Sequence, residues 1–68
     1  MTTLSKRIKE LRMEKGLSQP QLARAIGCSK GQISFWENGL NEPKASYVVK
    51  LADVFGVSTD YLLGRTDW

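Results

Sequence analysis

The sequence predicts an all-α fold, a compact bundle of five short helices in one domain. Apolar residues recur at the spacing of an amphipathic helix, and no stretch alternates convincingly as a half-buried strand does. Serine or threonine precedes most of these periodic segments and glycine follows most of them, as is typical of helix caps and stops. With 68 residues, the chain forms one small domain with a thin stability margin.

The first expected helix spans roughly residues 4–15, with Thr2 or Thr3 as its cap and Gly16 as its stop. One face of this helix carries the apolar residues Leu4, Ile8 and Leu11. We therefore expect this face to point into the core.

The next two expected helices both begin with a capping box, in which serine and a glutamine three residues later satisfy each other's backbone amides. The second helix follows Ser18 and runs to about residue 26, and the third follows Ser29 and runs to about residue 37. Gly27 lies between them, where the chain needs a positive φ to turn. Small or apolar residues fall where two crossing helices touch, at Leu22, Ala23, Ile26, Cys28, Ile33 and Trp36. This spacing predicts a helix-turn-helix.

Two further helices are expected after a loop at residues 40–44 that contains Pro43. The fourth spans about residues 45–55 and carries Val48, Leu51, Ala52 and Phe55 on one side. The fifth is the short segment TDYLL, which is capped by Ser58 and precedes Gly64. We expect a domain core at about residues 4–63 and a frayed tail at residues 65–68.

Charge is distributed unevenly along the chain. Residues 1–30 hold seven basic and two acidic groups, a balance of +5, whereas residues 31–68 hold three basic and five acidic groups, a balance of −2. A cationic half attracts polyanions, of which nucleic acid is the commonest in cytoplasm. The alternative is an ordinary solvated helix face.

Several classes of function lack the residues they need. There is no histidine to act as a general base, and no cluster of Cys, Asp or Glu has metal-ligand spacing. We therefore expect no enzyme activity, no cofactor, no metal and no small-molecule substrate. No run of 18 apolar residues predicts a membrane span, and the lone Cys28 without an apolar signal core fits a reduced cytoplasmic setting.

The chain resembles the helix-turn-helix of lambdoid phage repressors and Cro proteins, also called the XRE family. The residues that carry the resemblance are IKELRMEKGLSQPQLARAIGCSKGQISFWENG at 8–39 and LADVFGVSTDYLLG at 51–64. The resemblance covers about residues 4–63, and residues 1–68 are expected to form one domain. It implies a lambda-repressor-like domain whose third helix enters the major groove of double-stranded DNA. It also implies a sequence-specific transcriptional regulator, most often a repressor at a palindromic operator.

Carried over residue by residue, the resemblance places Lys30, Gly31, Ser34 and Phe35 at the base edges. Lys30 can donate to O6 and N7 of guanine. Gly31 departs from the family pattern: it either lets the backbone approach the groove or is a tolerated glycine in the first turn. Phe35 either lies against a thymine methyl group or covers the domain surface.

The resemblance further implies contacts to the DNA backbone from Gln19, Gln32, Asn38 and Lys44. For Gln19 the alternative is a solvent-exposed side chain, and for Asn38 it is a helix stop. Arg12 and Glu37 resemble a partly buried ion pair that joins the first helix to the third.

Family members usually bind as dimers, and the resemblance implies a weak homodimer through the fourth and fifth helices, including Tyr61 and Leu62. The competing hypothesis is a helical protein-interaction module, such as an antitoxin, because the net charge of +3 is modest and Glu42 lies where phosphate would repel it. We expect a regulator in the cytoplasm of a bacterial cell or a phage-infected one.

Overall fold

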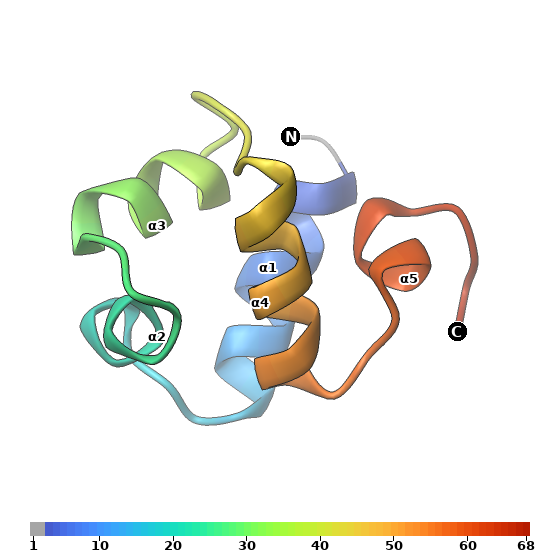
Figure 1. Ribbon diagram of the computed structural model, residues 1–68, viewed down its shortest axis with the longest axis horizontal. Coiled ribbons are helices and arrows are strands. Elements are labelled where there is room, and N and C mark those ends of the chain that lie inside the picture. Colours follow the sequence, from blue (N-terminus) through green and yellow to red (C-terminus); the bar gives the residue numbers. More distant parts are fainter. Residues whose placement is uncertain (1–2) are drawn as a thin grey trace.

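The protein is described by a computed structural model over residues 3–68, and this range contains five helices and no strand (Figure 1). The helices are α1 (Thr3–Glu14), α2 (Gln19–Ile26), α3 (Lys30–Glu37), α4 (Ala45–Phe55) and α5 (Thr59–Leu63). The expected all-α fold is confirmed. Thr3 is the first residue of α1 rather than its cap, and Thr2 lies outside the described residues.

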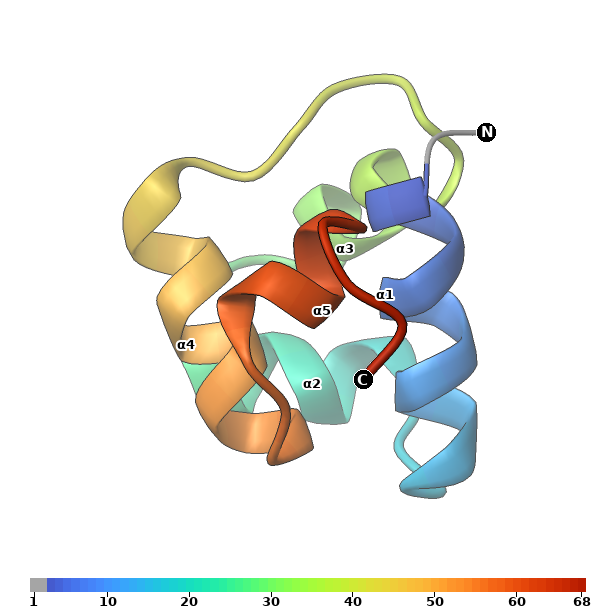
Figure 2. The same ribbon diagram turned by 90° about the vertical axis from the view of Figure 1, so that its right-hand side faces the viewer.

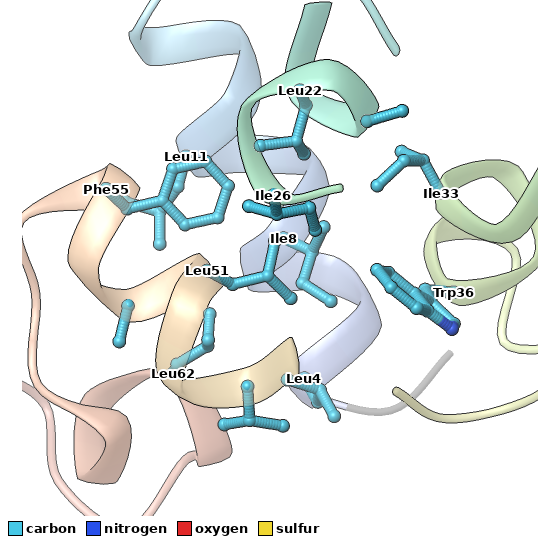
Figure 3. Packing of buried hydrophobic residues seen from close by; sticks show 13 residues of the cluster. Leu4, Ile8, Leu11, Leu22, Ile26, Ile33, Trp36, Leu51, Phe55 and Leu62 are labelled. Carbon is cyan, nitrogen blue, oxygen red and sulfur yellow. The ribbon is translucent and has the colours of Figure 1, made fainter. Parts of the chain in front are cut away.

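One apolar cluster holds the five helices together (Figure 3). Each helix contributes one large side chain that is fully buried: Ile8, Leu22, Ile33, Leu51 and Leu62. Burying a side chain of this size stabilises a fold by about 1.5–3 kcal/mol. The same few residues therefore stabilise the domain and fix the position of every helix.

Helices α1 and α4 lie in the middle of the domain, with α2 and α3 on one side and α5 on the other (Figure 1). When the molecule is turned by a quarter, α5 lies in front and α3 behind it (Figure 2). Helix α3 therefore lies on the side of the domain opposite to α5.

The C-terminal segment is held against α1, contrary to the frayed tail that we expected. The Arg7 guanidinium donates to the carbonyl of Tyr61 and, over 2.9 Å, to the carbonyl of Thr66. It also lies 3.8 Å from the Asp67 carboxylate. Because one side chain from α1 binds two backbone carbonyls far along the chain, residues 65–68 fold back beside α1 and α5 (Figure 2).

Candidate nucleic-acid interface

The turn between α2 and α3 is fixed by caps on both sides. Each helix begins with a complete capping box, Ser18 with Gln21 and Ser29 with Gln32. Between them Gly27 adopts a φ of 77°, and the amides of Gly27 and Cys28 both donate to the Ala23 carbonyl over 2.9 Å. The end of α2 and the start of α3 are therefore set by local hydrogen bonds.

Helix α3 has two different faces. Ile33, Trp36 and Glu37 are buried, and Ile33 and Trp36 point into the core (Figure 3). On the outward side Lys30, Gly31 and Phe35 are exposed and Ser34 is half-buried. We call these four residues the reading surface; the structure brings them together on two successive turns of one helix.

A buried carboxylate joins α3 to the two preceding helices. Glu37 is only 3% exposed. Its Oε2 accepts from Arg12 Nε at 2.6 Å, and its Oε1 accepts from Arg12 Nη2 at 3.1 Å and from Gln19 Nε2 at 3.2 Å. A buried charge is tolerated when it is paired and hydrogen-bonded, as it is here. The ion pair expected from the sequence is present.

Gln19 supports α3 from α2, a role that the family resemblance implies beside a contact to the DNA backbone. Gln19 is the first residue of α2, is half-buried, and uses one amide hydrogen on Glu37. An amide nitrogen carries two hydrogens, so the second stays available for an acceptor. The hydrogen bond to Glu37 restricts where that second donor points.

Two more of the expected phosphate-binding side chains, Asn38 and Gln32, also have partners within the chain. Asn38 ends α3, and its Nδ2 donates to the Ser34 carbonyl at 2.9 Å and to the Ser34 hydroxyl at 3.3 Å. Gln32 accepts from the Ser29 amide through Oε1 at 3.0 Å. Asn38 thus ends the helix, which was the alternative given for it, and Gln32 forms part of the N-terminal cap. For both residues, contact with phosphate stays a prediction.

Lys44 is exposed at the start of α4, beside a hollow next to α3. This hollow has a volume of about 280 Å³ and is lined by Gln32, Trp36, Asn41, Glu42, Lys44 and Tyr47. Its lining contains one cation and one anion, so the charge of Glu42 offsets that of Lys44. No buried side-chain nitrogen or oxygen of the described residues lacks a hydrogen-bond partner, so the hollow contains no unpaired group of this kind.

Cys28 lies in the turn before α3 and is half-buried. Burial raises the pKa of its thiol, and the nearby Lys50 ammonium opposes this shift. A raised pKa keeps the thiol protonated near neutral pH, which is the unreactive form.

The expected dimer surface needs a correction. Leu62 is fully buried in the core, so it cannot present a surface to a second chain. Tyr61 is half-buried, and its ring lies under the Arg7 guanidinium, 4.0 Å from the ring centroid to Cζ. The large apolar side chains that α4 and α5 expose are instead Val49, 51% exposed, and Leu63, 46% exposed. They border a hollow of about 380 Å³.

Two absences can be stated for the described part of the chain. None of the helices formed by residues 3–68 has the length and apolar character needed to cross a bilayer. Within the same range, no group of three or more His, Cys, Asp or Glu side chains lies close enough to hold a metal ion.

The sequence profile of a helix-turn-helix family matches residues 8–62, most of the chain. The chain belongs to this helix-turn-helix family. Among curated relatives, it is similar to the HTH-type transcriptional regulator ImmR of Bacillus subtilis, 34% identical over 96% of this chain and 51% of that protein. It is also similar to the CTXphi transcriptional repressor RstR of Vibrio cholerae, 40% identical over 93% of this chain and 57% of that protein. The chain thus spans about half the length of these curated relatives.

Solved structures of the same family match nearly the whole domain. The P22 c2 repressor in complex with a synthetic operator is 30% identical, with a TM-score of 0.87, over 93% of this chain and 96% of that one. The biofilm regulator SinR in complex with DNA is 36% identical, with a TM-score of 0.82, over 88% of this chain and 97% of that one. Both of these structures contain DNA.

Proposed function

We propose that the protein binds double-stranded DNA sequence-specifically and regulates transcription, acting as a repressor. In this proposal α3 enters the major groove and the reading surface meets the base edges. A DNA-binding regulator acts where the DNA is, so we place it in the cytoplasm of a bacterium or of a phage-infected bacterium.

The observation that carries the proposal is the division of α3 into a buried and an exposed half. Ile33, Trp36 and Glu37 are each no more than 3% exposed, so the helix cannot rotate without breaking the core. On the other half of the helix the side chains of Lys30 and Phe35 are exposed and that of Ser34 is half-buried. A rigid helix that presents such residues without covering them is suited to a groove about 12 Å wide.

The decisive experiment selects bound sequences from a random duplex pool and then measures affinity by fluorescence anisotropy at several salt concentrations. We expect one enriched motif, and an affinity that falls steeply as salt rises because phosphate contacts release counterions. Lys30→Ala should relax the preference at one base pair, with a loss of about 1–3 kcal/mol on the selected site.

The matched control is Arg65→Ala, which removes one exposed cation from the segment after α5, on the side opposite α3. It should leave both base preference and affinity nearly unchanged. If no sequence is enriched and no duplex binds at low salt, the DNA-binding proposal is wrong and the protein-interaction module becomes the better hypothesis.

We further propose that two copies bind one palindromic operator and meet weakly through Val49 and Leu63. These side chains are half exposed and apolar, and they border the hollow between α4 and α5. Sedimentation with and without operator should show dimers chiefly on the DNA. Leu63→Glu should abolish cooperative occupation of the two half-sites while leaving binding to a single half-site intact.

A further inference from the structure

Helix α5 depends on its neighbours for its position, because it is too short to be stable alone. It has five residues, and isolated helices shorter than about 12–15 residues are marginal in water. Of these five residues, all of which the structure describes, only Leu62 is buried in the core. One buried side chain fixes one point of the helix, but it does not fix the direction in which the last turn faces.

Arg7 of α1 supplies a second point of attachment, at the end of α5. Its guanidinium donates to the Tyr61 carbonyl and, over 2.9 Å, to the Thr66 carbonyl, and its Cζ lies 4.0 Å from the centroid of the Tyr61 ring. We call these contacts the Arg7 clamp. The Arg7 side chain is 18% exposed, whereas the Asp67 carboxylate 3.8 Å away is fully exposed. Because exposed ion pairs contribute little, the carbonyls and the ring account for most of the attachment.

A third point of attachment lies one residue beyond α5. A Cβ added to Gly64 would lie 2.7 Å from Cγ2 of Thr3, the first residue of α1, which is closer than packed carbon atoms approach one another. The Gly64 amide donates over 3.1 Å to the Tyr61 carbonyl, which also accepts from Arg7. Helix α1 therefore contacts the last turn of α5 on both sides of Leu63.

Leu63 is one of the two apolar side chains that border the hollow between α4 and α5, and Val49 is the other. Val49 belongs to a helix of eleven residues with four buried side chains, so its position is fixed by the core. The position of Leu63 depends instead on the last turn of α5. A shift of that turn would separate the two apolar side chains.

We propose that Arg7 is a positioning residue for association between copies of the chain. The Arg7 clamp holds the last turn of α5 and so keeps Leu63 beside Val49, where a second copy contacts both. The inference rests on the dimer proposed above and adds to it a residue outside the contact surface. The Arg7 guanidinium faces α5, on the side of the domain away from α3, so binding to a single half-site does not require it.

The first measurement is hydrogen exchange of the Gly64 and Arg65 amides, which donate to carbonyls of α5. In Arg7→Ala both amides should exchange about tenfold faster or more, because hydrogen bonds from a charged donor are lost and the helix end opens locally. Arg7→Lys keeps the charge but replaces the planar fork with a single ammonium. Its exchange rates should therefore lie between those of the wild type and of Arg7→Ala.

The second measurement compares binding to one half-site with binding to the full palindrome, at a temperature where every variant is folded. Arg7→Ala should bind the single half-site with wild-type affinity and lose cooperative occupation of the two, as Leu63→Glu does. Arg7→Lys should recover part of the cooperativity. Where Arg7→Ala does not fold, Arg7→Lys alone makes the test, with an intermediate loss expected in both measurements.

Glu10→Gly is the matched control, because Glu10 is exposed on α1 and the exchange weakens this helix without altering the Arg7 clamp. It should lower the unfolding temperature and keep the cooperativity. If Glu10→Gly loses cooperativity as well, general instability explains the effect and the positioning role is wrong.

The remaining outcomes separate the clamp from the dimer. If the Gly64 and Arg65 amides exchange at the wild-type rate in Arg7→Ala, the clamp is wrong. If they exchange faster while cooperativity stays, and Leu63→Glu removes it, Arg7 does not position the surface and the dimer proposal stands. If Leu63→Glu keeps cooperativity, the proposed dimer surface is wrong and the inference fails with it.

Discussion

Arg12 on α1 and Glu37 on α3 form a two-point ion pair, with Nε to Oε2 at 2.6 Å and Nη2 to Oε1 at 3.1 Å. The Glu37 side chain is almost fully buried. The pair therefore controls how α3 is seated on α1, although neither residue belongs to the reading surface.

Removing one partner of this buried ion pair should lower the free energy of unfolding far more than removing one partner of an exposed ion pair. Arg12→Ala leaves the Glu37 carboxylate buried and unpaired, and we expect a loss of about 3–5 kcal/mol in the free energy of unfolding. Arg65→Ala, which breaks an exposed pair with Asp60, should cost less than about 1 kcal/mol. Urea unfolding followed by circular dichroism measures both. Equal losses for the two variants would contradict the structural role given to Arg12.

Substitution of Gln19 and substitution of Lys44 should each weaken DNA binding, but with different dependences on salt. Gln19→Ala removes a neutral donor held by Glu37, so affinity should fall for all sequences while the salt dependence stays the same. Lys44→Ala removes a cation, so the slope of log K against log salt should fall by about 1. Salt titrations of both variants on selected and random duplexes make the comparison. A changed slope for Gln19→Ala would exclude its proposed role.

Substitutions at the neighbouring residues Leu62 and Leu63 should affect different properties, the stability of the fold and the formation of dimers. Leu62 is fully buried, and Leu62→Ala should cost about 2–5 kcal/mol of unfolding free energy. Leu63 is 46% exposed, so Leu63→Ala should change the free energy of unfolding by about 0.5 kcal/mol at most. Thermal unfolding and sedimentation on the operator are the two measurements. Loss of stability in Leu63→Ala without loss of dimer formation would argue against the proposed interface.

The Cys28 thiol should react slowly in the folded protein. Its pKa is raised above the ordinary value near 9.0, chiefly by burial. At pH 8 iodoacetamide should therefore label the native protein more slowly than the urea-unfolded chain. A raised pKa of this kind also gives stability that is present below pH 9 and is lost as pH rises through the folded value. Equal labelling rates in the two states would show that the thiol is not protected.

Much of the fold could be predicted because local signals and long-range packing agree. The capping boxes at Ser18 and Ser29 and the turn at Gly27 are short-range features, and each forms as its residues predict. The outward position of the reading surface follows from the same periodicity, since the apolar residues of α3 must face the core.

The errors came from contacts that join distant parts of the chain. Nothing near Arg7 in the sequence shows that it will bind carbonyls more than 50 residues later. We therefore expected residues 65–68 to be frayed. Leu62 and Leu63 are chemically identical neighbours on a five-residue helix, too short for its period to show which one faces the core. Only the packing of α5 against α1 and α4 decides between them.

The Arg7 contacts carry the end of the chain to the side of the domain away from α3, and Trp68 there is 86% exposed. A dye or a surface tether attached at that position would lie on the side of the domain away from α3. The proposed DNA binding could then be followed on immobilised protein with the reading surface left free.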